Sequence, residues 1–310
     1  MTALTPGRDS SRSRLSTVLQ YIATATIWGA SFLFIKVASG GLSPAQVVLG
    51  RLVGGALLLA LLMLLTGRRW PRGLVWLHFM AMAFIMCVAP FLLFSWAAET
   101  LPSGLSSIFN ATTPIATLLL ALAVLPEERL TKVKTVALFV GAGGIVLVLA
   151  PWQLGRAAEA ATLLPQLACL VGSVMYGAGF IYSRRFFRSH EFDASTVAAS
   201  QITSAAAIML VLAPFIAGDP VALSTSVIAS MLLLGTIGTG IAYVWYNNVM
   251  NVWGATRAST VTYLTPLVAV ALGITVLGEQ LSWHEAAGGL VVIIAVLVAQ
   301  SDSLPRPYRR

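Results

Sequence analysis

The chain has 310 residues, of which 58% are apolar and only 10% charged, and its mean hydropathy is +0.87. Soluble domains are about one quarter charged, so this composition excludes a water-soluble globular protein and predicts an all-α integral membrane protein. The net charge of +8 does not indicate nucleic-acid binding, because the basic residues form short clusters between apolar runs, where they orient membrane helices and contact lipid headgroups.

Ten apolar runs follow one another along the chain, each of a length that can cross the roughly 30 Å hydrocarbon core of a bilayer. They are 16–38, 44–66, 73–98, 103–125, 132–151, 161–183, 194–217, 225–249, 255–277 and 283–300. The sequence therefore predicts ten transmembrane helices between an N-terminal tail, 1–15, and a C-terminal tail, 301–310. The first run is too long for a signal peptide and lacks a small-residue cleavage site, so we expect it to stay in the mature protein.

Lysine and arginine alternate with these runs in the way that the positive-inside rule requires. If the N-terminus is cytoplasmic, the outside loops contain only Arg156. The inside segments then contain Arg8, Arg12, Arg14, Arg68, Arg69, Arg72, Arg129, Lys132, Lys134, Arg184, Arg185, Arg188, Arg257, Arg306, Arg309 and Arg310. We expect both termini to be cytoplasmic, and a miscounted helix would destroy the alternation.

The two segments 103–130 and 255–282 are similar when one is shifted by 152 positions. Ser107 then aligns with Ser259, Pro114 with Pro266, and Glu127 with Glu279. A proline inside an apolar run removes a helix hydrogen bond and clashes with the preceding turn. We therefore expect the fourth and ninth helices to bend or break at Pro114 and Pro266, and these two prolines to act as hinges.

The first and sixth runs also correspond to each other. Trp28-Gly29-Ala30-Ser31-Phe32 matches Tyr176-Gly177-Ala178-Gly179-Phe180. These matches predict two repeats of five helices, 16–151 and 152–300. Because five is odd, the repeats must have opposite orientations in the membrane, which is the plan of secondary transporters with a site between the halves at the midplane.

With these motifs, and with Glu128-Arg129-Leu130 and Glu279-Gln280-Leu281 after the proline helices, the chain resembles the drug/metabolite transporter superfamily, and in particular its ten-helix EamA-type exporters. The resemblance covers about residues 16–300. It implies a basket-like fold in a bacterial inner membrane and the transport of amino acids or similar metabolites. A subgroup of the family exports aromatic amino acids and toxic compounds.

The depth of the polar and aromatic residues indicates a central cavity. At about 1.5 Å rise per residue, Trp28, Pro114 and Pro266 all lie near the midplane, too deep for an interfacial aromatic belt. Asn110 is one turn before Pro114, and a buried amide should face the protein interior. We expect a substrate-binding cavity lined by Trp28, Asn110, Tyr176 and Tyr263, with Ser31 and Tyr243 as further members. Packing within the bundle is the alternative role for these side chains.

Arg51 is the basic side chain that lies clearly within a span. It can extend to the outer headgroups, pair with Glu99 as an outer gate, or bind a substrate carboxylate. All acidic residues lie in loops or at helix ends, so a carboxylate-based proton relay and a site for permanent cations are not expected. Facilitated diffusion or exchange follows as the expected mode, with proton movement through His78 or a chain of water molecules as the alternative.

No metal site, cofactor or catalytic residue is expected, because the chain has no Cys/His cluster and no nucleophile–base motif. Cys87 and Cys169 fit packing roles in apolar runs. The predicted function is export of a small-molecule substrate, most simply a neutral or aromatic amino acid, by alternating access. Multidrug efflux is the alternative within transport, and a membrane-embedded enzyme is the alternative from another class. The expected partners are the substrate and the lipid bilayer, without nucleic acid, for a monomer or weak homodimer.

Overall fold

The computed structural model describes residues 8–125, 130–153, 157–186, 192–253, 258 and 260–301, and all regular structure in these ranges is helical. Eight helical stretches are long and apolar enough to cross a membrane, and two shorter apolar helices, Val261–Leu277 and Trp283–Ala299, follow them. The predicted all-α membrane protein with ten helices is confirmed. Some residues used in the sequence analysis lie outside the described residues: Glu127, Glu128, Arg129, Arg156, Arg188, Arg257, Ser259, Arg306, Arg309 and Arg310.

The helices of the first half are α1 (Arg8–Ala38), α2 (Pro44–Leu65), α3 (Val75–Ala83), α4 (Ala89–Thr100), α5 (Ser103–Asn110), α6 (Thr113–Val124) and α7 (Lys132–Leu149). Those of the second half are α8 (Ala157–Phe186), α9 (Ala194–Ile216), α10 (Thr225–Leu232), α11 (Ala242–Trp253), α13 (Val261–Leu277) and α14 (Trp283–Ser301). Helix α1 begins within the stretch predicted as a tail.

Two spans contain π-helical segments that the sequence analysis did not predict. The segment η1 (Phe84–Val88) joins α3 to α4 in the third span, and η3 (Leu233–Ile241) joins α10 to α11 in the eighth span. These spans occupy the same position in the two repeats. The shift of 152 positions that aligns the prolines also aligns Cys87 in η1 with Thr239 in η3.

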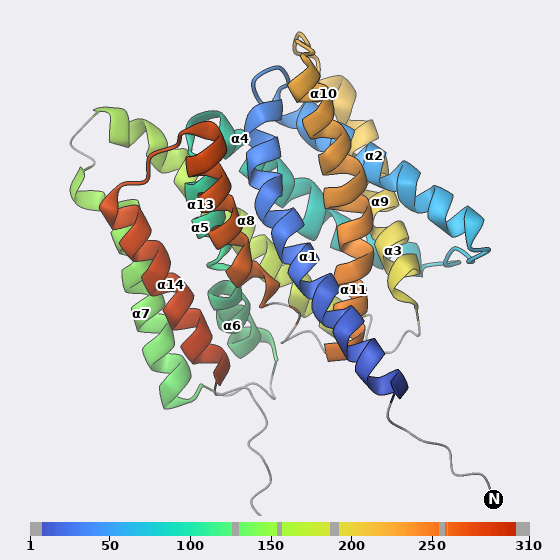
Figure 1. The fold of residues 1–310 in the computed structure, drawn as a ribbon, viewed down its shortest axis with the longest axis horizontal. Coiled ribbons are helices and arrows are strands. Elements are labelled where there is room, and N and C mark those ends of the chain that lie inside the picture. The colour runs from blue at the N-terminus through green and yellow to red at the C-terminus, as the bar shows by residue number, and fades with distance from the viewer. Residues whose placement is uncertain are drawn as a thin grey trace, which may run out of the picture.

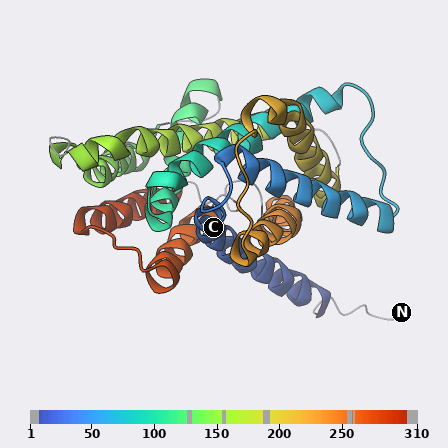
Figure 2. The same cartoon turned by 90° about the horizontal axis from the view of Figure 1, so that it is seen from above.

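The two halves of the chain interleave. Helix α1 lies between α11 and α13 of the second half, and α8 packs on α4 and α6 of the first half. Helix α2 packs on α9 and helix α7 packs on α14, so that these two pairs also join the halves. Figure 1 shows the α7–α14 pair at one side of the molecule, and Figure 2 shows the blue N-terminal helix beside orange helices from the second half. Neither sequence repeat is a separate packing unit.

A glycine after each central aromatic residue allows this interleaving. A Cβ on Gly29 of α1 would lie 2.8 Å from the Thr265 carbonyl oxygen and 2.6 Å from Val268 Cβ in α13. A Cβ on Gly177 of α8 would lie 2.9 Å from the Thr117 nitrogen in α6. Only a residue without a side chain fits either contact, so each aromatic-Gly motif brings the first helix of one repeat against the proline helix of the other.

The two prolines have different effects on their helices. In the fourth span, α5 ends at Asn110 and α6 begins at Thr113, so the expected break is present immediately before Pro114. The Phe109 carbonyl at this break accepts hydrogen bonds from Thr112 and, across the halves, from Ser173 Oγ at 2.9 Å. In the ninth span, Pro266 lies inside the continuous helix α13. The prediction was a bend or a break; the break at Pro266 is wrong, because α13 continues through the proline, and a bend there stays a prediction.

Segments that the predicted order of membrane crossings places on the same side of the membrane contact one another. Ala222 N donates to the Gly41 carbonyl at 2.9 Å, and Gln46 Nε2 donates to the Asp219 carbonyl at 2.6 Å. Both contacts join loops expected on the side away from the N-terminus. On the opposite side, Arg68 forms an ion pair with Asp193. These contacts agree with the expected order of crossings and do not depend on which side is cytoplasmic.

Glu279 is a further link between the halves. Helix α13 ends at Gly278, whose φ of 66° is left-handed, and the Glu279 amide donates back to the Gly273 carbonyl. This turn directs the Glu279 carboxylate onto the first turn of α5, where it accepts bonds from Ser103 N at 2.7 Å, Ser103 Oγ at 2.8 Å and Gly104 N at 3.2 Å. A carboxylate at a helix N-terminus also interacts favourably with the helix dipole.

We predict that Glu279→Gln lowers the free energy of unfolding by about 1–2 kcal/mol, because the charged acceptor of α5's free amides is lost. Thermal unfolding in detergent measures the effect. Glu99→Gln is the matched control, since Glu99 is exposed. Equal melting temperatures for the two variants would contradict the capping role.

Asp193 lies just outside the span formed by α9 and caps its N-terminus through Ser195 N and Thr196 N. Partial burial alone would raise the pKa of the Asp193 carboxyl, but hydrogen bonds from Thr196 and Ser195 and the Arg68 charge lower it below its ordinary value. A lowered folded-state pKa contributes stability above the unfolded pKa of about 4, and this stability is lost as the pH falls through the folded value.

We predict that acidification from pH 7 toward pH 3 destabilises the wild type more than Asp193→Asn, which cannot titrate at this position. At pH 7, Asp193→Ala should cost about 1 kcal/mol through the lost cap. Arg68→Gln should cost less, because its ion pair is half exposed and such pairs contribute little. Melting temperatures across the pH range measure all three variants. Parallel pH profiles for the wild type and Asp193→Asn would exclude this role.

Candidate functional site: a central cavity between the halves

A central cavity of about 910 Å³, including the part that is open to solvent, lies between the two halves. Aromatic residues are the largest group in its wall: Trp28, Phe32, Phe91, Phe94, Tyr176, Phe180, Tyr243 and Tyr246. The other lining residues are apolar (Ile35, Met82, Met86, Met250), amide or hydroxyl-bearing (Ser31, Asn110, Thr113, Ser183, Gln201, Asn247, Thr262) or cationic (Arg51). None of these lining residues is acidic.

Five of the six predicted binding residues line this cavity: Trp28, Ser31, Asn110, Tyr176 and Tyr243. Asn110 and Thr113 reach it from the two sides of the break in the fourth span. The structure thus brings the five predicted residues together in one cavity, whereas their contact with a substrate stays a prediction.

Tyr263 does not line the cavity. It packs with Ala111 and Ile115 and with Val292 and Val296 of α14. Its neighbour Thr262 faces the cavity instead. The prediction placed Tyr263 at the right depth, but consecutive helix positions point about 100° apart, and depth along an axis does not determine which face is turned inward.

The aromatic wall is continuous across the halves. The Trp28 ring lies 5.6 Å from that of Tyr243 and 4.9 Å from that of Tyr246, centroid to centroid. On another side, Phe94 lies 6.0 Å from Tyr176 and 5.8 Å from Phe32. Such pairs add about 0.5–1.5 kcal/mol each beyond their buried area, so the rings form a packed wall rather than independent side chains.

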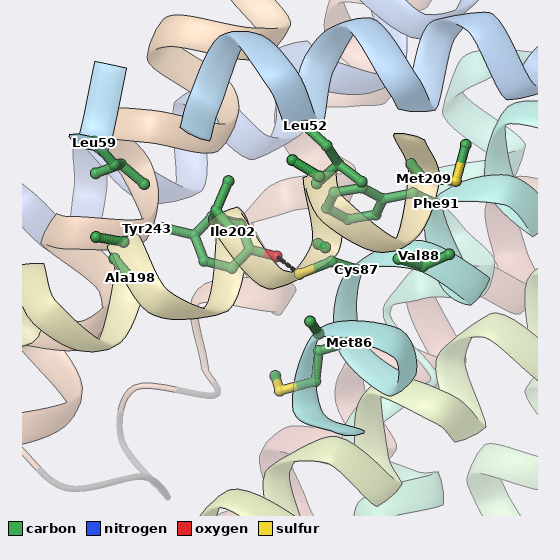
Figure 3. Packing of buried hydrophobic residues seen from close by; sticks show 14 of the residues in the cluster. Leu52, Leu59, Met86, Cys87, Val88, Phe91, Ala198, Ile202, Met209 and Tyr243 are labelled. Atoms are coloured by element: carbon green, nitrogen blue, oxygen red, sulfur yellow. Dashed lines mark hydrogen bonds between the residues drawn. The ribbon is translucent and has the colours of Figure 1, made fainter. Parts of the chain in front are cut away.

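The π-helical segments contribute polar atoms to this region. Trp28 Nε1 donates to the Gly238 carbonyl at 3.2 Å, and Thr239 Oγ1 donates to the Leu234 carbonyl five positions earlier at 2.8 Å. Widening of the helix moves the carbonyl groups out of the i−4 pattern and makes them available to other donors. In η1, the Cys87 thiol lies 3.4 Å from the Tyr243 hydroxyl (Figure 3).

Arg51 is buried, with 4% of its surface exposed. Its guanidinium carbon lies 3.8 Å from the centroid of the Phe91 ring, and Nε donates to Thr239 Oγ1 at 3.2 Å. Extension of this side chain to the lipid headgroups is therefore wrong. In the part of the chain that the structure describes, no ion pair joins Arg51 to the exposed Glu99, so a gate formed by this pair would require another conformation.

The sequence analysis did not predict several of the residues that line the cavity. Tyr246 and Asn247 lie one turn after Tyr243 on the same helical face, and that spacing could have identified them. Gln201 is a buried amide in an apolar run, like Asn110, and the argument that such an amide should face the protein interior could have identified it as well. Phe91, Phe94 and Phe180 gave no signal, because phenylalanine is equally common in packing positions and on lipid-facing surfaces.

Comparison with known proteins gives a consistent assignment. The EamA-like transporter family matches the chain twice, over residues 15–150 and 163–300. The "Uncharacterized inner membrane transporter YedA" of Escherichia coli (strain K12) is 26% identical over 280 residues, which are 88% of this chain and 87% of that protein. The "Probable terminal-alkyne amino-acid exporter" of Streptantibioticus cattleyicolor is 23% identical over 286 residues, 92% of this chain and 93% of that protein.

A solved crystal structure of a protein that is 20% identical superposes with a TM-score of 0.60 and covers 93% of this chain and 98% of that chain. At this identity the likeness concerns the fold alone. The family match includes both halves and, with them, the helices that form the cavity. The chain belongs to the EamA-like transporter family and is a multi-pass membrane transporter of small metabolites.

Proposed function

We propose that this protein exports neutral or aromatic amino acids, or closely related compounds, across a bacterial inner membrane by alternating access. The observation that carries the proposal is the composition of the cavity wall, whose described residues combine aromatic rings, amides and hydroxyls with a single cation and no acidic side chain. This wall suits a small molecule with an apolar body and a carboxylate. The name of the exporter from Streptantibioticus cattleyicolor supports the same class.

The proposed mechanism uses the opposite orientation of the repeats. Because every central helix packs on the other half, a movement of one repeat against the other changes the cavity opening on both sides of the membrane. The break before Pro114 provides one hinge. The second is Pro266, which cannot donate to the Thr262 carbonyl one turn earlier and weakens α13 locally without ending it.

The distribution of basic residues supports an orientation with both termini in the cytoplasm. The described residues that line the cavity include no carboxylate, so the proposed mode is facilitated diffusion or exchange rather than proton antiport. Efflux of cationic drugs is the less favoured alternative, because Arg51 would repel them. The names of the relatives indicate a transporter rather than an enzyme.

We predict saturable uptake of neutral or aromatic amino acids into proteoliposomes that contain the purified protein. A panel of radiolabelled amino acids, assayed with and without a pH gradient, measures this flux against empty liposomes. Counterflow should accelerate uptake, and the pH gradient should leave the initial rate within about twofold. Transport of lipophilic cations without any amino-acid flux would favour drug efflux, and strict dependence on the gradient would exclude the uncoupled mode.

We also predict that Trp28→Ala and Asn110→Ala each reduce exchange by tenfold or more, because both side chains line the cavity. Trp28→Ala also removes the hydrogen bond to Gly238. Tyr263→Phe is the control: it changes an aromatic residue at similar depth that packs against α14, and its transport should stay near the wild-type rate. Unchanged transport by both alanine variants would place the substrate site elsewhere.

A further inference from the structure

Arg51 is a buried positive charge that has no acidic partner among the residues that the structure describes. It lies seven residues after the start of the second span, within the membrane, and a charge in this position is costly unless a polar or charged group compensates it. The lining of the cavity contains no aspartate or glutamate, and the ion pair within the described residues is Arg68–Asp193, at a helix end. The compensating anion for Arg51 is thus not supplied by the cavity wall.

The contacts of Arg51 fix its orientation but do not use its terminal nitrogens. Nε donates to Thr239 Oγ1 at 3.2 Å, and the face of Phe91 packs against the guanidinium at 3.8 Å. In the described part of the chain, Nη1 and Nη2 have no hydrogen-bond partner, and the side chain lines the cavity. A planar guanidinium held in this way presents two parallel N–H groups, which match the two oxygens of a carboxylate.

The position in the second repeat that corresponds to Arg51 is occupied by a neutral residue, Gln201. Arg51 lies eight positions after the N-cap Ser43 of α2, and Gln201 lies eight positions after the N-cap Asp193 of α9. Arg51 bonds to Thr239 in η3, and Gln201 bonds at 3.3 Å to Cys87, the aligned residue of η1. The two repeats therefore build the same contact twice, once with a charge and once with a neutral amide.

We propose that Arg51 is the carboxylate-binding residue of this transporter and that it makes the cavity selective for small monocarboxylates, amino acids included, over the corresponding amides and amines. The inference rests on the proposed function and specifies its substrate chemistry. The carboxylate lies on Nη1 and Nη2, and the apolar part of the solute lies against the aromatic wall around Trp28, Tyr176 and Tyr243. Both tyrosines line the same cavity as Arg51. One cation in this wall binds one carboxylate and leaves no second cation for a dicarboxylate, while the amide and hydroxyl oxygens of the wall can accept hydrogen bonds from the ammonium group of an amino acid.

The test is competition against radiolabelled L-phenylalanine, or against the best-transported member of the amino-acid panel. For phenylalanine the competitors are 3-phenylpropionate, which keeps the carboxylate, and L-phenylalaninamide, which keeps the ammonium group. In the wild type, 3-phenylpropionate should compete at a concentration at least tenfold lower than the amide. A lost charge-assisted hydrogen-bond pair corresponds to about a 10- to 100-fold change in affinity.

Arg51→Gln recreates the neutral side chain of the related position and should abolish the preference for the carboxylate. Arg51→Lys keeps the charge without the bidentate geometry and should retain part of it. Arg72→Gln removes an exposed arginine and should behave like the wild type. Equal competition by the two compounds in the wild type, or an undiminished preference in Arg51→Gln, would overturn the proposal.

A second measurement separates this proposal from the transport function. In detergent, 3-phenylpropionate should raise the melting temperature of the wild type and of Arg72→Gln but not that of folded Arg51→Gln, and phenethylamine should stabilise none of them. If no panel member is transported, the proposed function fails, and the melting temperatures alone decide the role of Arg51. Equal stabilisation of the wild type and Arg51→Gln, or none of either, excludes carboxylate binding by this residue.

Discussion

The cavity exists because each repeat holds the first helix of the other repeat at very short range. Gly29 lies against the backbone of α13, and Gly177 lies against the backbone of α6. These contacts leave no space for a Cβ, so the neighbouring aromatic residues, Trp28 and Tyr176, are fixed in the cavity wall. Close backbone approach at glycine is a common means of helix association in lipid, where apolar side chains gain nothing by leaving the lipid tails. The remaining central contacts follow from this exchange of helices.

The membrane also requires that the carbonyl groups of irregular backbone segments find hydrogen-bond donors. Inside a bilayer, free carbonyl groups must find donors within the protein or in a cavity. At the break before Pro114, the Phe109 carbonyl accepts from Thr112 and from Ser173 of the other half. In η3, the Gly238 carbonyl accepts from the Trp28 indole. Both irregular segments are thus stabilised by side chains of the opposite repeat, which ties their geometry to the relative position of the two halves.

The two repeats share some features and differ in others, and this comparison helps to distinguish structural roles from functional ones. The glycine contacts, the N-caps of α2 and α9 and the π-helical segments occur in both repeats, which indicates that they belong to the architecture. Arg51 and Gln201 occupy related positions but differ in charge. A duplicated scaffold can tolerate such a difference at a cavity wall, where a solute or water compensates the charge, more easily than in a packed interior. Specificity in this fold is therefore expected where the repeats differ.

The sequence by itself determined the membrane class, the ten spans, their alternation and the duplication, because hydrophobic length, basic clusters and aligned motifs are local properties of the chain. It also identified five of the residues that line the cavity, among them Trp28 by its depth, Asn110 by its burial cost and Tyr176 by its correspondence with Trp28 in the repeat. The tertiary structure alone decided which helix faces turn inward, and this excluded Tyr263 and included Gln201, Tyr246 and Thr262.

The tertiary structure also decided that the span with Pro114 breaks while α13 continues through Pro266. Pro165 and Pro214 likewise lie inside continuous helices. A proline removes one donor wherever it stands, so the proline alone does not decide whether a helix opens. At the break before Pro114, the Phe109 carbonyl accepts a hydrogen bond from Ser173 of the other half of the chain, a contact that only the tertiary structure supplies.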